Sequence, residues 1–144
     1  MVAANYLKKG RLIMFASIEM PLYNGKVENI EFISNAATCR RYKMIFGDDL
    51  LTKFANAEKD VDGVKKYDID FLPELAYVMA MQAAAMSDQE VNLLKLNNDT
   101  FIDWLEQFDS MSFENKATEI LNVYLRTQIT ASEPKKNKEE LKEK

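Results

Sequence analysis

The stretch LPELAYVMAMQAAAM, residues 72–86, decides the fold, because its side chains are apolar nearly all round. A helix of this kind is usually buried within a protein rather than lying on its surface. Pro73 is acceptable in the first turn of such a helix, and Asp70 is positioned to cap it. We therefore expect residues 72–86 to run through the middle of a helical bundle.

Upstream of this helix, RYKMIFGDDLLTKF (residues 41–54) allows three interpretations: a phosphate loop, a catalytic acidic pair or a joint between helices. A phosphate loop needs several glycines, and neighbouring aspartates at a helix start do not converge on one point. Gly47 follows a helically spaced apolar run, where glycine commonly ends a helix. Asp48 or Asp49 can begin the next helix. The capping chemistry favours the joint.

The region that precedes these helices predicts one β-hairpin over about residues 14–33. Its two β-type runs flank Asn24-Gly25, the strongest short hairpin signal. Pro21 makes the end of the first strand irregular. Ser34 or Asn35 is then placed to cap the first helix.

The C-terminal half predicts two further helices. In residues 99–108, Thr100 and Asp103 approximate a capping box. In residues 112–129, Ser112 is the expected cap and the apolar stripe is the clearest in the chain. Both patterns place their aromatic and aliphatic side chains on one face, toward the same core.

Length and composition fit one mostly α (α+β) domain. The chain has 144 residues but only 4 Gly and 3 Pro, which favours long helices over many short strands. We expect a globular domain over residues 14–130, with about four to five helices between residues 35 and 129. Residues 1–13 are predicted to be an N-terminal arm. Residues 131–144 are dense in charge and predict a disordered tail.

Composition also bears on function. The chain has no histidine and a single cysteine, Cys39, which excludes Ser-His-Asp and Cys-His catalysis and any histidine metal site within it. A small hydrolase is therefore disfavoured. The net charge of -4 gives no general attraction to nucleic acid. The most apolar run, residues 75–86, is shorter than the roughly twenty residues that a membrane span needs.

Three groups of residues are candidates for a site. Arg40, Arg41 and Lys43 form a local basic patch, which a solvated helix face explains better than nucleic-acid binding. Four acids in the predicted loop 59–70 lack the ligand spacing of a calcium loop: Asp60, Asp62, Asp68 and Asp70. The third group supplies core side chains or an adaptable groove for a helical partner: Met79, Met81, Met86, Trp104, Phe108 and Tyr124.

Several segments, in this order, carry a family resemblance. They are NGK (24–26), RYKMIFGDDLL (41–51), ELAYVMAMQA (74–83), TFIDWLEQFD (100–109), EILNVYLRTQ (119–128) and TASEPKK (130–136). The set, over residues 14–136, resembles the tail assembly chaperones of long-tailed bacteriophages (siphoviruses) and of prophages of Gram-positive bacteria. No single segment is diagnostic.

The resemblance implies a non-enzymatic protein that binds the tape measure protein, a long and mostly helical polypeptide, and keeps it soluble. Tail tube subunits then assemble around that polypeptide, so the tail tube protein is a further expected partner, and self-association along the tape measure protein is expected. The resemblance places the protein in the host bacterial cytoplasm and not in the mature virion. It also implies a longer frameshifted form in many members.

The resemblance implies no catalytic, cofactor-binding or metal-binding residue, no cofactor, no small-molecule substrate and no membrane partner. It leaves the partner-binding surface open. The alternative hypothesis is a small regulatory protein that binds nucleic acid through Arg40, Arg41 and Lys43.

Overall fold

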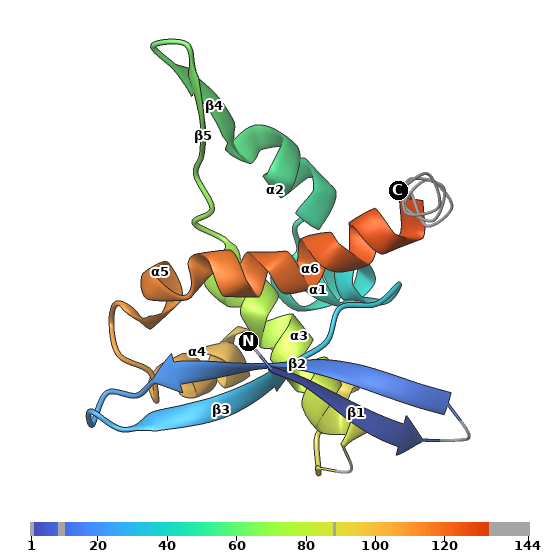
Figure 1. The fold of residues 1–144 in the computed structure, drawn as a ribbon. Helices are drawn as coiled ribbons and strands as arrows, with labels where there is room; N and C mark the ends of the chain where they lie inside the picture. Colours follow the sequence, from blue (N-terminus) through green and yellow to red (C-terminus); the bar gives the residue numbers. More distant parts are fainter. Residues whose placement is uncertain (1, 9–10, 88, 133–144) are drawn as a thin grey trace, which may run out of the picture.

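The computed structural model describes residues 2–8, 11–87 and 89–132, with side chains described from residue 15 to residue 125 except at positions 59, 65–67 and 88. The mostly α class is confirmed. The described part contains six α-helices, one 3-10 turn and two small sheets, in the following order (Figure 1). The elements are β1 (Val2–Lys8), β2 (Arg11–Pro21), β3 (Val27–Phe32), α1 (Thr38–Phe46), α2 (Leu50–Ala57), β4 (Glu58–Val61), β5 (Val64–Tyr67), α3 (Leu72–Met86), η1 (Leu93–Lys95), α4 (Asn98–Leu105), α5 (Ser112–Asn115) and α6 (Ala117–Ser132).

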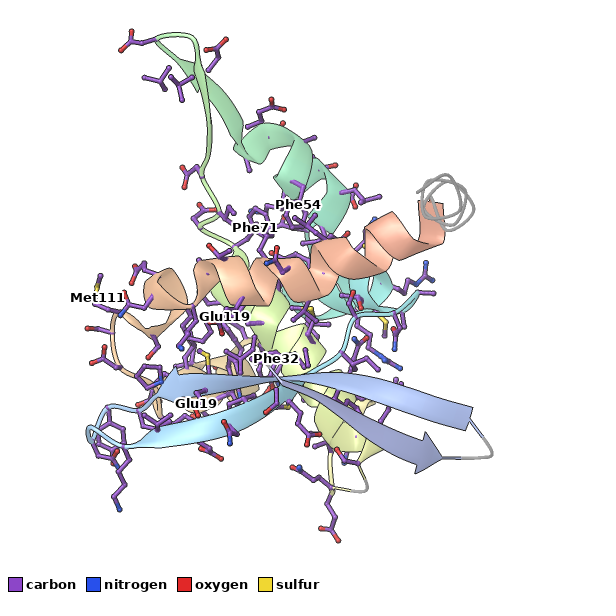
Figure 2. The ribbon with its side chains drawn as sticks, viewed as in Figure 1. Glu19, Phe32, Phe54, Phe71, Met111 and Glu119 are labelled. Carbon is purple, nitrogen blue, oxygen red and sulfur yellow. The ribbon has the colours of Figure 1, made fainter. Side chains whose placement is uncertain are left out.

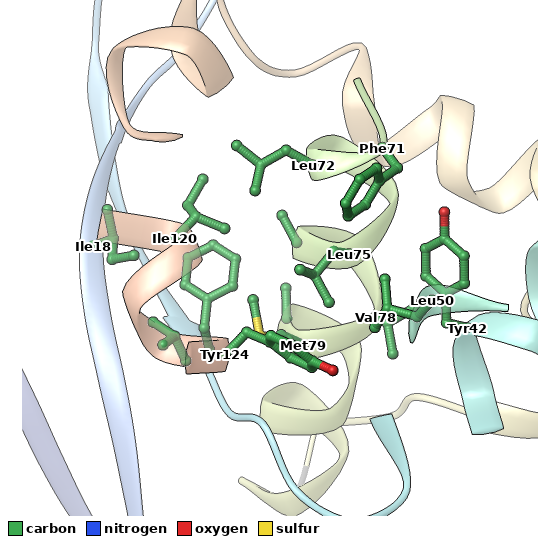
Figure 3. Close-up of a cluster of buried hydrophobic side chains, with 14 of the residues drawn as sticks. Ile18, Tyr42, Leu50, Phe71, Leu72, Leu75, Val78, Met79, Ile120 and Tyr124 are labelled. Atoms are coloured by element: carbon green, nitrogen blue, oxygen red, sulfur yellow. The ribbon is translucent and has the colours of Figure 1, made fainter. Parts of the chain in front are cut away.

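Helix α3 is the central element, as its apolar sequence predicts. It contacts α1, α4, α6, β3 and η1, and Leu75, Ala76, Met79 and Ala83 on it are fully buried. Figure 3 shows side chains from the sheet, α1, α2 and α6 gathered around this helix. Each fully buried Leu or Met contributes about 1.5–3 kcal/mol relative to exposure, so α3 anchors the fold.

The predicted N-terminal hairpin is confirmed by β2 and β3, which pair antiparallel with Ile18 opposite Ile30. Gly25 in its turn has a φ of 83°, and the Lys26 backbone N–H donates to Asn24 Oδ1 at 3.0 Å. Strand β1 adds a third strand in the order β1-β2-β3. It lies within the segment predicted as an arm, and β2 begins at Arg11 rather than near residue 14.

The joint between two helices is confirmed between α1 and α2. Gly47 has a φ of 80°, and its N–H donates to the carbonyl of Lys43 at the end of α1. Asp49 precedes α2 and accepts a hydrogen bond from the Thr52 hydroxyl at 2.8 Å. Asp49 therefore lies at the start of a helix, and Asp48 forms an ion pair with Lys53 of α2 at 3.4 Å.

The prediction of a loop over residues 59–70 was wrong for its first part, because β4 and β5 form a second antiparallel hairpin there. Asp62 and Gly63 both have positive φ, 53° and 78°, which matches the two-residue turn whose twist suits a hairpin. The hairpin projects from the body of the molecule (Figure 1). We call residues 58–67 the arm hairpin. Its base is closed by a 2.8 Å hydrogen bond from the Asp68 N–H to the Ala57 carbonyl.

The single helix predicted over residues 112–129 is two helices, α5 and α6, separated at Lys116. Ser112 does not cap a helix. It is buried, and its hydroxyl donates to the Pro21 carbonyl at 2.6 Å, which ties this segment to the end of β2. Tertiary hydrogen bonding has therefore overridden the local capping pattern.

Two other predicted caps also differ. The capping box of α4 joins Asn97 to Thr100 rather than Thr100 to Asp103. Residue 71, not Asp70, precedes α3, with no side-chain cap. The prediction that Ser34 or Asn35 caps α1 was also wrong. Ala37 precedes α1 and no side chain caps it, while Asn35 Oδ1 accepts a hydrogen bond from the Ala37 N–H at 2.9 Å.

At the C-terminus, α6 continues to Ser132, through the first two residues of the predicted tail, and the rest of that tail lies outside the described residues.

Candidate functional site

A groove with mostly apolar walls lies between α1 and η1 and has a volume of about 420 Å³. Its lining residues are Ala37, Arg40, Arg41, Met44, Ile45, Leu93 and Leu94. Met44 is 62% exposed and Leu94 is 83% exposed. When large apolar side chains that are this exposed lie together, they form a surface that can bind another molecule. We call this surface the α1–η1 groove.

Local structure explains why these side chains face outward. On α1, Tyr42 points into the core and is 1% exposed, so Met44, two residues further, lies on the opposite side of the helix. The 3-10 turn η1 is held by its own cap, in which Asn92 Oδ1 accepts a hydrogen bond from the Leu94 N–H at 3.1 Å. This short turn leaves Leu93 half-buried and Leu94 exposed.

The structure separates the three residues of the predicted basic patch. Arg40 is exposed and lines the groove. Arg41 also lines it, but its Nη1 donates to Gln82 Oε1 at 3.0 Å. Lys43 is exposed and is not part of the groove lining. Arg40 is thus the exposed arginine of the groove lining, whereas Arg41 is half-buried and bonded to Gln82.

Gln82 is a residue whose role the sequence analysis missed. It is fully buried in α3, and its amide nitrogen donates to the Ile33 carbonyl and to the Thr38 hydroxyl, both at 3.0 Å. With the bond from Arg41, this amide fixes the start of α1 against α3. The signal that the sequence offered for this role is the primary amide of Gln82 within an otherwise apolar run. A polar side chain buried in such a run needs hydrogen-bond partners.

The methionine and aromatic candidates belong mainly to the core. Met79, Phe108 and Tyr124 are buried. Met81 and Trp104 are partly buried and pack against the core, and Met86 is also partly buried. Among the described side chains, the methionines with large exposure are instead Met44 and Met111, at 62% and 51%. Met111 lies at the edge of the molecule in the loop before α5 (Figure 2).

The four acids of the predicted loop do not meet at one point. Asp60 and Asp62 lie in the arm hairpin, Asp68 lies at its base, and Asp70 lies just before α3. Within the described residues, no group of three or more acidic, cysteine or histidine side chains is arranged to hold a metal ion.

Among the described residues, no group with a shifted pKa lines the groove. Burial, together with the nearby charge of Asp70, raises the pKa of Glu74 on α3, and Lys53 opposes this shift. Burial is also the main cause that raises the pKa of Tyr124, whose hydroxyl lies 3.5 Å from Cys39 Sγ. Burial of these side chains in the core is thus the first cause of both shifts.

The described residues contain no helix with the length and apolar character needed to cross a membrane. No protein-family model, no curated protein and no solved structure matches the chain.

Proposed function

We propose that this protein is a phage tail assembly chaperone that binds the tape measure protein, keeps it soluble and promotes assembly of the tail tube around it. The proposal comes from the ordered segments that resemble that family. The observation that supports it is the α1–η1 groove, where Met44 and Leu94 are exposed beside Arg40. The protein acts by binding and not by catalysis.

The groove fits an amphipathic helix, which binds through apolar anchors spaced three to four residues apart. Methionine suits this task because its flexible side chain repacks around different anchors. Burial of Met44 and Leu94 would each contribute roughly 1.5–3 kcal/mol before the costs of ordering. A single groove therefore binds weakly, and many copies along one long tape measure protein would supply the avidity.

The test is co-expression with a tape measure protein. We expect the wild-type protein to raise the soluble fraction of the tape measure protein and the Met44→Asp, Leu94→Asp double variant to abolish this effect. Leu51→Asp is the matched control, because Leu51 on α2 is 59% exposed and lies outside the groove. If the wild-type protein leaves the soluble fraction unchanged, the proposed function is wrong.

The alternative hypothesis, nucleic-acid binding through Arg40, Arg41 and Lys43, stays a prediction. It requires the three cations to act together, whereas Arg41 is engaged by Gln82. Its signature would be DNA binding that weakens with salt and with Arg40→Ala plus Arg41→Ala. An absence of binding near physiological salt would remove it.

A further inference from the structure

Strand β3 forms one edge of the three-stranded sheet, because the strand order is β1-β2-β3. Residues 28–31 make no hydrogen bond with a described residue apart from those that pair β3 with β2. Just after the strand, the Ile33 N–H donates to the Met79 carbonyl of α3 at 3.2 Å. The outer backbone groups of β3 are therefore open up to that point. An open strand edge can pair with another polypeptide.

A channel follows this open edge. It has a volume of about 300 Å³, and residues 28–31 form one of its walls. The opposite wall includes Ala80 and Ala84 of α3 and Trp104 of α4. Successive side chains of a strand point to opposite faces of the sheet, so a channel that is lined by four consecutive residues runs along the edge rather than over one face. We call it the β3-edge channel.

Two backbone hydrogen bonds mark the ends of this channel. The bond from Ile33 to Met79 lies at one end, and at the other the Tyr23 N–H donates to the Gln107 carbonyl at 3.0 Å, which ties the β2–β3 turn to the segment after α4. Between these two bonds, residues 28–31 extend over roughly 13 Å. An extended peptide of four or five residues is long enough to span this distance.

The β3-edge channel is negatively charged. Glu28 and Glu31 are exposed, and neither forms an ion pair with a described side chain. Among the described residues that line the channel, none is a lysine or an arginine. Glu28 lies on the same face of β3 as the buried Phe32, whereas Glu31 lies on the opposite face. The open edge thus has a carboxylate on each side.

Trp104 supplies an aromatic surface in the opposite wall. Its side chain is half-buried, and its ring packs against those of Tyr77 and Phe108, with 5.3 and 4.7 Å between ring centroids. This packing holds the indole in place. Tryptophan attracts a cation more strongly than the other aromatic side chains do. A lysine or arginine side chain in the channel would therefore meet both a carboxylate and an indole ring.

We propose that the β3-edge channel binds an extended, basic segment of a partner protein by strand addition. The backbone of that segment pairs with the open edge of β3, as extended peptides do at other exposed sheet edges. Two of its lysine or arginine residues, three positions apart, face Glu28 and Glu31, because these glutamates lie on opposite faces of the sheet. The basic residue that faces Glu28 also contacts Trp104.

This site is separate from the α1–η1 groove, with which it shares no lining residue. The groove is lined mainly by apolar side chains and suits the anchors of a helix, whereas the channel suits an extended chain with basic side chains. One copy of the protein can therefore hold two segments of different conformation. Binding at the channel does not depend on the proposed function.

The test is titration with a synthetic peptide that has capped ends, two lysines three positions apart, and valine or threonine elsewhere. Trp104 is the single tryptophan of the chain, so its fluorescence reports occupation of the channel. We expect a saturable change with this peptide and none with the same peptide carrying glutamate in place of lysine. Isothermal titration calorimetry measures the dissociation constant independently of Trp104.

A double variant tests the role of charge. Glu28→Lys, Glu31→Lys is expected to raise the dissociation constant of the lysine peptide about tenfold or more, because like charges then face each other. Asp60→Lys, Glu114→Lys is the matched control, since it changes the net charge equally at exposed positions outside the channel. This control should bind the peptide within about threefold of wild type.

Two modified peptides test strand addition. Each carries N-methyl groups on one of the two alternate sets of amides and keeps both lysines. A methylated amide has no hydrogen to donate, and in one of the two peptides the methylated amides are those that pair with β3. We expect that peptide to bind about tenfold more weakly than the other.

Three results would each overturn the inference: no binding of the lysine peptide by fluorescence or calorimetry, unchanged binding by the Glu28→Lys, Glu31→Lys protein, or equal binding of both methylated peptides. The Met44→Asp, Leu94→Asp variant of the groove should bind the lysine peptide like wild type, and a loss of binding there would also count against a separate site. Failure of the proposed function, measured by solubility of the tape measure protein, leaves these expected results unchanged.

Discussion

At the scale of the residue, Gln82 has the clearest consequence for stability. Its buried amide makes three hydrogen bonds, to Ile33, Thr38 and Arg41. Gln82→Leu would leave the Ile33 carbonyl without this partner, and an unsatisfied buried polar group costs about 1–3 kcal/mol. We expect the free energy of unfolding, measured in urea, to fall by that amount. Gln89→Leu is the control, since Gln89 is exposed, and equal effects of both variants would contradict the argument.

Residues that act on their own neighbours in the chain have roles that the sequence predicts. Gly47 ends α1 as predicted because its left-handed φ is a local requirement. Residues whose partner is distant in the chain do not. Ser112 has the composition of a cap, yet its hydroxyl bonds to Pro21, more than ninety positions earlier in the chain, and no local pattern encodes that contact.

At the scale of the element, the joint between α1 and α2 depends on the conformation of Gly47. A Cβ atom added there would meet nothing within 4 Å, so the effect of Gly47→Ala comes from its φ of 80°. The left-handed region costs an alanine roughly 1–2 kcal/mol. We expect a loss of stability of that size in urea unfolding. Gly47→Asn should lose less, because asparagine tolerates this conformation, and a neutral Gly47→Ala would show that the joint adopts another turn.

The sequence predicts those elements that have a strong local pattern. The apolar run predicts α3, and the Asn24-Gly25 turn between two β-type runs predicts the first hairpin. The arm hairpin lacks such a pattern, and the sequence predicts a loop there. Its strands have four residues each, too short for a pattern of alternation to stand out among charged residues. The Asp62-Gly63 turn was the usable signal. The split between α5 and α6 had no such signal, because helical spacing continues across Lys116.

The candidate site was only partly predictable. Arg40 was singled out from sequence and does line the groove, but Met44 and Leu94 come from segments that are fifty positions apart in the chain. Which methionines are buried depends on how α1, η1 and α3 pack together, and the sequence alone does not separate a core methionine such as Met79 from a surface one such as Met44.

At the scale of the whole molecule, the arm hairpin stands apart from the core that α3 organises. Val61 and Val64 near its turn are 44% and 59% exposed, and its strands contact each other and, through β4, the end of α2. A two-stranded hairpin by itself is marginally stable in water. The core residue Ala57 and Asp68 are already joined by a backbone hydrogen bond at its base, so a two-residue linker can replace residues 58–67.

We expect this shortened chain to unfold cooperatively, with a free energy of unfolding within about 1 kcal/mol of the full chain. The reason is that the side chains described in the arm hairpin, at residues 58 and 60–64, are exposed, and that the excision leaves the hydrogen bond between Ala57 and Asp68 in place. Phe108→Ala is the contrasting control, because Phe108 is buried and loss of a buried phenylalanine costs about 3–5 kcal/mol. If the shortened chain instead loses its cooperative thermal transition, the arm hairpin is part of the folding unit and the division drawn between arm and core is wrong.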